Sequence, residues 1–143
     1  MKAGCCSNGM PESNPRVRPW VRMGEVDFDV ASHEMLRGDE APFSAVCFHA
    51  QQCVEKYLKA LLVHHAVDFP KTHDLEVLFG MVPNASGLKL AIADLNLLSS
   101  YAVEGRYPGD WELPNREEAD AALAIARTAR DAARKCLPKE SLA

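Results

Sequence analysis

The chemistry most readily identified in this sequence is phosphate binding by an arginine. Arg106 and Tyr107 lie in the glycine- and proline-rich segment 104–114, which cannot be helical throughout. A guanidinium in a loop between rigid helices can hold a phosphate with two hydrogen bonds and stabilise charge that develops on it. The structural alternative is an ion pair between Arg106 and a nearby carboxylate, Glu104 or Asp110, with Tyr107 covering the end of the helices. The residue pattern leaves both interpretations open.

A second group of polar residues lies at helical spacing within the apolar run 48–63. Its members are Gln52, Glu55, Lys56 and Lys59. Residues three and four apart are neighbours on a helix, so these side chains share one strip beside the apolar face. Glu55 precedes Lys59 by four residues, which is the favourable order for an ion pair. The spacing by itself predicts a solvated helix face with one weak salt bridge.

Histidine is the third residue type that could carry chemistry. His73 lies between Thr72 and Asp74 at a predicted helix start. There Thr72 is expected to be the N-cap and Asp74 to complement the helix dipole, with His73 as an exposed or hydrogen-bonded loop residue. The other histidines have no ligand spacing of a known kind, so no metal site is expected. They are His33, His49, His64 and His65.

Helical segments must position these residues. Apolar residues at intervals of three and four predict helices over about 20–37, 42–67, 88–103 and 115–136, with a short helix after Thr72. Asn115 and Glu118 predict a capping box at the start of the last helix, whose alanine-rich inner side allows a close neighbour. No strand-like alternation occurs. The expected fold is all-α, an antiparallel up-and-down four-helix bundle with one short extra helix.

Bulk properties indicate one domain of 143 residues, 48% hydrophobic and 25% charged. A net charge of −4 argues against tight non-specific nucleic-acid binding, so any nucleic acid would meet a local basic patch. We expect a flexible leader over 1–18, the bundle over 19–138 and a tail over 139–143. No run of 18 apolar residues indicates a membrane span, and the five cysteines without CxxC spacing favour reduced thiols in the cytoplasm.

Three segments in this order resemble the HEPN family, small helical domains with a link to nucleotides. They are the run 48–63, then Lys71-Thr72-His73-Asp74-Leu75, and then Gly105-Arg106-Tyr107-Pro108. The resemblance spans roughly Trp20 to Cys136. In the family, the helix that corresponds to 48–63 lines a groove near a dimer interface. The resemblance therefore implies a homodimer and a nucleotide-binding site in which lysine and amide groups contact phosphate and base. Its residues would be Gln52, Lys56, Lys59, Arg106 and Asp110.

The resemblance also implies a partner and sets the candidate functions. The first is a nucleotide-binding accessory protein of a toxin–antitoxin-like module, beside a separately encoded minimal nucleotidyltransferase. No cofactor is expected beyond that nucleotide. The second is a metal-independent endoribonuclease with Arg106 as its catalytic residue. HEPN ribonucleases place a histidine after four to six residues, where this chain has Trp111, Glu112 and Leu113. The third is a non-enzymatic dimeric interaction module.

Overall fold

Helices make up all the regular structure in the residues that the computed structural model describes, 14–102 and 112–143. The α-helices are α1 (Val17–Met35), α2 (Phe43–His64), α3 (Leu75–Met81), α4 (Ile92–Ser99) and α5 (Arg116–Lys135). Short 3-10 turns cover Gly38–Glu40, Asn84–Ser86 and Lys139–Ser141. The all-α prediction is confirmed over this part of the chain. None of the described helices has the length and apolarity to span a bilayer.

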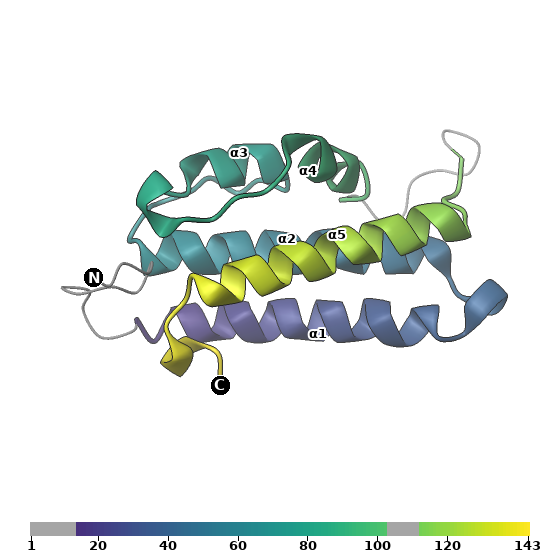
Figure 1. Cartoon of the computed structure of the whole chain (residues 1–143), viewed down its shortest axis with the longest axis horizontal. Helices are drawn as coiled ribbons and strands as arrows, with labels where there is room; N and C mark the ends of the chain where they lie inside the picture. Colours follow the sequence, from purple (N-terminus) through teal and green to yellow (C-terminus); the bar gives the residue numbers. More distant parts are fainter. Residues whose placement is uncertain (1–13, 103–111) are drawn as a thin grey trace.

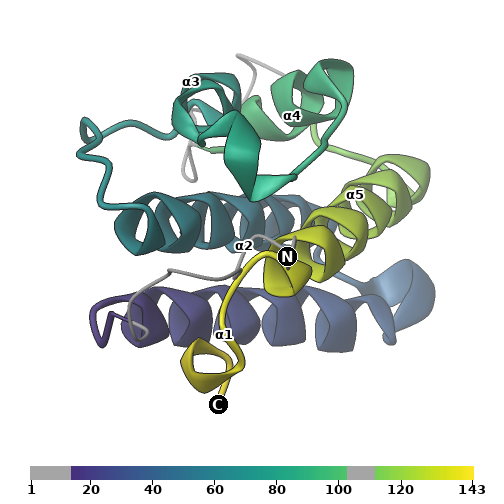
Figure 2. The same cartoon turned by 60° about the vertical axis from the view of Figure 1, so that its left-hand side comes forward.

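Helix α2 lies at the centre of the molecule. It contacts each of the other four α-helices. Figure 1 shows α1 alongside α2 and α5 crossing obliquely against this pair, with α3 and α4 on the side of α2 away from α1. The turned view in Figure 2 shows the same layers. Because α2 is enclosed in this way, every residue from 50 to 63 except Gln52 is buried.

The start of α5 follows its sequence signals. The Asn115 side chain accepts a hydrogen bond from the Glu118 backbone N–H at 2.8 Å, and the Glu118 carboxylate accepts from the Asn115 N–H at 3.0 Å. These two bonds form the predicted capping box. The inner side of the helix is buried against α2 and α1 through its alanines. They are Ala119, Ala122, Ala126, Ala129 and Ala133.

The fourth helix is shorter than predicted. It covers only Ile92–Ser99, so three long helices and two short ones form the bundle in place of four long and one short. Leu88 and Leu90 are both packed against the core, while Lys89 and Ala91 are exposed. That alternation belongs to an extended segment, in which successive side chains point to opposite sides. The prediction that Leu88 belongs to one face of a helix is therefore wrong.

Candidate functional site

A strip of polar side chains on α2 forms the candidate site. We call it the α2 strip, and its members are Gln51, Gln52, Glu55, Lys56 and Lys59. The solvated face that the spacing predicted is wrong, because Glu55 is only 2% exposed and Lys56 and Lys59 are each 8% exposed. Charged side chains are rarely buried to this extent unless they are paired. The partners of each charge therefore decide what the strip can do.

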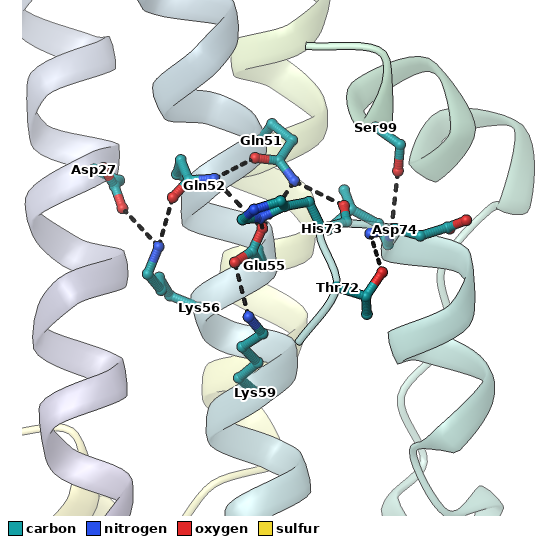
Figure 3. A network of polar contacts seen from close by, with 11 residues as sticks. Asp27, Gln51, Gln52, Glu55, Lys56, Lys59, Thr72, His73, Asp74 and Ser99 are labelled. Atoms are coloured by element: carbon teal, nitrogen blue, oxygen red, sulfur yellow. Dashed lines mark hydrogen bonds and ion pairs between the residues drawn. The ribbon is translucent and has the colours of Figure 1, made fainter. Parts of the chain in front are cut away.

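Glu55 is the acceptor at the centre of the strip (Figure 3). Its carboxylate accepts from Lys59 Nζ at 2.9 Å, so the predicted ion pair is confirmed. It also contacts His73 Nδ1 at 2.8 Å and accepts from Gln51 Nε2 at 3.2 Å. Burial by itself would raise the pKa of Glu55, but the bonds from His73, Lys59 and Gln51 together hold that pKa below its ordinary value. Glu55 is therefore an anion at neutral pH.

A second branch of the network joins α2 to α1. Lys56 Nζ donates to Gln52 Oε1 at 2.7 Å and lies 3.9 Å from Asp27 Oδ2 on α1. The other carboxylate oxygen of Asp27 lies 2.8 Å from His49 Nδ1. Gln52 links the branches, since its Nε2 donates to Gln51 Oε1 at 2.7 Å. Figure 3 shows the resulting chain of contacts from α1 across α2 to the segment before α3.

Lys59 connects the strip to a pair of aromatic rings. Its Nζ lies 5.6 Å from the ring centroid of Trp20 and 5.7 Å from that of Phe69, within the range of cation–π attraction. The two rings meet edge to face with centroids 6.1 Å apart. Both rings line a cavity of about 450 Å³, together with Arg16 and Asp68. The buried cation thus lies against two aromatic rings that also line this cavity.

The segment before α3 is fixed at several points. The side chain of Asp74 accepts from the backbone N–H groups of Glu76 and Val77, so Asp74 is the N-cap of α3. The prediction that Thr72 would cap this helix is wrong, and Thr72 Oγ1 instead accepts from the Asp74 N–H at 3.1 Å. Gln51 Nε2 also donates to the His73 carbonyl at 3.1 Å.

Three of the predicted site residues lie together on α2, namely Gln52, Lys56 and Lys59. Arg106 and Asp110 lie outside the described residues. Asp27, His49 and Gln51 also belong to the network, although the sequence pattern did not single them out. A signal was present for Gln51, which lies four residues before Glu55 and hence next to it on the helix. No such signal exists for Asp27, because its contact depends on how α1 packs against α2.

A separate network lies between α1, α2 and α5. Arg130 donates two hydrogen bonds to the Glu25 carboxylate, at 2.7 and 2.8 Å. The Tyr57 hydroxyl donates to Glu25 and accepts from Arg134 Nη1 at 2.9 Å. Burial opposes ionisation of Glu25, but the Arg130 and Tyr57 bonds lower its pKa below the ordinary value. These arginines therefore do more than complement the α5 dipole, because they join three helices.

Metal binding has no support in the described part of the chain. No group of three or more His, Cys, Asp or Glu side chains there is placed to hold a metal ion. His64 and His65 lie next to each other, with ring centroids 4.8 Å apart. Burial lowers the pKa of both imidazoles.

The described residues form a helical bundle with a buried polar strip on its central helix. The HEPN domain model matches residues 17–136, so the chain belongs to the HEPN domain family. Comparison with curated proteins gives no significant match.

Two solved structures share this fold. The protein TT1696 from Thermus thermophilus is 22% identical, with a TM-score of 0.72 over 87% of this chain and 100% of that one. ST0689, described as an archaeal HEPN homologue, is 21% identical, with a TM-score of 0.63 over 82% of this chain and 94% of that one. At this level of identity the likeness concerns the fold.

Proposed function

We propose that this protein is a nucleotide-binding accessory component of a HEPN–nucleotidyltransferase module. One observation carries the nucleotide-binding part, namely the cavity lined by Trp20 and Phe69 beside the buried Lys59. Its volume of about 450 Å³ falls in the range of small-molecule sites. Aromatic side chains stack on bases of any sequence, and arginine and lysine bind phosphate. Gln52, Lys56, Arg106 and Asp110 complete the proposed set.

Trp20 allows this proposal to be tested directly. The chain has two tryptophans, so a Trp111→Phe background leaves Trp20 as the single reporter. Titration with ATP or GTP is expected to change Trp20 fluorescence and to raise the melting temperature. Saturation at 100 times Kd adds about 2.7 kcal/mol to the free energy of unfolding.

A matched pair of variants locates the binding. Phe69→Leu is expected to weaken binding about tenfold, since base stacking contributes about 1–3 kcal/mol. Phe43→Leu, at the opposite end of α2, is expected to leave it unchanged. Absence of any shift at millimolar nucleotide would refute nucleotide binding. A melting shift without a fluorescence change would place the nucleotide elsewhere.

The partner and the oligomeric state belong to the same proposal. The protein forms a homodimer and binds a minimal nucleotidyltransferase encoded beside it. Analytical ultracentrifugation of the purified chain is expected to give twice the 15.7 kDa monomer mass. Co-expression with a neighbouring nucleotidyltransferase gene is expected to give a co-purifying complex. A monomeric mass would contradict the homodimer, and failure of the two proteins to co-purify would contradict the partnership.

RNA cleavage is a second candidate function, and a specific observation favours it. The chain lacks a histidine at the expected distance after Arg106, yet the α2 strip holds an exposed histidine, His73, against the buried Glu55. Expression is then expected to arrest growth, and Arg106→Ala is expected to abolish the arrest. An equally toxic Arg106→Ala variant would remove the arginine from this role.

A further inference from the structure

Helix α1 carries a line of apolar side chains on the face that points away from α2 and α5. Met23 is 47% exposed and Val26 is 62% exposed. Pro19 continues this line as an exposed residue and Val30 as a partly exposed one. We call these four residues the α1 stripe. Figures 1 and 2 show α1 at the edge of the bundle, with α2 and α5 on its other side.

The spacing of the α1 stripe is that of a coiled-coil seam. Its members are separated by four, three and four residues, a repeat of 3.5 that keeps side chains facing a second helix. Single exposed apolar residues are normal on a protein surface and need no explanation. A line of four at this interval extends over about 16 Å of the helix and forms a continuous surface for another helix.

Charged side chains flank the stripe, and their sign changes along the helix. Arg16 and Arg22 lie toward the N-terminal end of α1, and both are exposed. Asp29 and Glu34 lie toward the C-terminal end, and the side chain of Asp29 is 72% exposed. At 3.6 residues per turn, Arg22 and Asp29 fall on one side of the stripe, while Arg16 and Glu34 fall on the other. Each side therefore has a basic end and an acidic end.

We propose that the α1 stripe is the interface with a second copy of this chain, whose α1 runs antiparallel. This inference deepens the homodimer proposed above and rests on it. A two-fold axis midway along the stripe places Pro19 against Val30 of the partner subunit and Met23 against Val26 of the partner subunit. The same surface then covers itself, as a two-fold interface requires.

Charge complementarity selects the antiparallel orientation. About the same axis, Arg22 faces Asp29 of the partner subunit, and Arg16 faces Glu34 of the partner subunit. Each pair occurs twice because of the symmetry. A parallel arrangement would instead place arginine beside arginine and carboxylate beside carboxylate, which is unfavourable across an interface.

The first test is the mass of two matched variants in analytical ultracentrifugation. Val26→Glu places charges in the centre of the stripe and is expected to be a monomer. Leu97→Glu is the control, because Leu97 on α4 is also exposed, at 44%, and lies outside the stripe. It should remain a dimer. Both positions are exposed, so both variants should keep the helical circular dichroism spectrum of the wild type.

The outcomes separate this interface from the homodimer on which it rests. A dimeric Val26→Glu variant would overturn the α1 stripe as the interface and leave a homodimer formed through another surface. A wild type that stays monomeric at every concentration would overturn both.

Charge reversal tests the pairing across the interface. Arg22→Glu is expected to raise the Kd of the dimer at least tenfold, because two like charges then face each other at each end. The double variant Arg22→Glu/Asp29→Arg restores opposite charges and should return the Kd to the wild-type value. A double variant that dimerises no better than Arg22→Glu would contradict the pairing.

Cysteine cross-linking tests the orientation. A Cys5→Ser/Cys6→Ser background leaves Cys47, Cys53 and Cys136, which are all buried. In that background, oxidation of Pro19→Cys mixed with Val30→Cys should give a disulfide dimer that contains one chain of each.

Neither cysteine variant should cross-link when it is oxidised alone. In the antiparallel pair, two copies of residue 19 lie about 16 Å apart along the helix, beyond the reach of a disulfide. Cross-linking of each variant with itself would mean that the helices run parallel and would overturn the proposed orientation.

Discussion

At the scale of single residues, Glu55 is a charged side chain that is almost completely enclosed by the bundle. Removing a carboxylate from water is costly, and the cost is offset here by donors from Lys59, His73 and Gln51. An apolar residue at this position of α2 would fit the core without such partners. The strip therefore joins α2 to its neighbours through specific polar contacts, at some expense in stability relative to apolar packing.

Replacing Glu55 by glutamine tests this account. Glu55→Gln is expected to lower the free energy of unfolding at pH 7 by about 3 kcal/mol, because the buried Lys59 loses its counter-ion. The folded-state pKa of Glu55 is lowered from its ordinary value of 4.5, so the wild-type carboxylate contributes stability above that pH and loses it as the pH falls further. Urea unfolding at pH 7 and at about pH 3 should show the difference between variant and wild type narrowing in acid. A difference in the free energy of unfolding that stays the same at both pH values would contradict a lowered folded-state pKa for Glu55.

The sequence could predict only part of this site. The neighbours of Glu55 on its own helix follow from the helical repeat, which is why Lys59 was correctly paired with it. The contacts of Asp27 and His73 come from α1 and from the segment before α3. Their positions depend on the packing of helices, and a single sequence does not contain that register. Arg106 and Asp110 lie outside the described residues, so their part in nucleotide binding stays a prediction.

At the scale of elements, the crossing of α1 and α2 depends on a glycine. A Cβ built on Gly24 would lie 2.9 Å from Tyr57 Cδ2, closer than real contacts allow. Gly24→Ala is therefore expected to destabilise the protein by about 1–2 kcal/mol, since the cost of overpacking exceeds the gain in helix propensity. Gly80→Ala in α3 is the matched control, because nothing lies within 4 Å of its added Cβ. That variant should be neutral or slightly stabilising in thermal unfolding, and equal losses for both would remove the packing explanation.

The end of α2 contains a residue in an unfavourable conformation. Ala66 has a φ of 58°, and its N–H donates to Val63 O while the Val67 N–H donates to Leu62 O. This is the Schellman motif, in which glycine is the usual residue at the left-handed position. Ala66→Gly is expected to raise the free energy of unfolding by about 1 kcal/mol. Ala121→Gly, at an exposed position within α5, should lower the free energy of unfolding by about the same amount. A destabilised Ala66→Gly variant would contradict the interpretation that the left-handed conformation of Ala66 is strained.

Helix ends also show where sequence patterns succeed. The capping box at Asn115 is local, since its two residues are three apart, and it was predicted correctly. The predicted end of α2 near Val67 was too late by three residues, because an alanine in place of glycine gives no stop signal. The segment 88–91 was also wrongly placed in a helix, because its residue pattern fits two kinds of structure. Leucines two apart fit an extended chain as well as one edge of a helix.

At the scale of the whole molecule, we expect the central position of α2 to make unfolding cooperative. Every other α-helix packs against α2, so loss of its packing removes support from all of them. Small domains of this size usually unfold in one transition. The two networks strengthen the coupling, because one links α1 to the segment before α3 and the other links α1 to α5 through Tyr57.

Two leucine variants test this cooperativity. Leu61→Ala, fully buried on α2, is expected to lower the free energy of unfolding by about 3 kcal/mol through the cavity it leaves. Leu97→Ala on α4, where the side chain is 44% exposed, should lower it by less than about 1 kcal/mol. Because α2 supports every layer, circular dichroism and tryptophan fluorescence should give the same midpoint in urea for both variants. Separate midpoints in Leu61→Ala would mean that α3 and α4 fold independently of the α1–α2–α5 layer, and that the α2 strip joins two units.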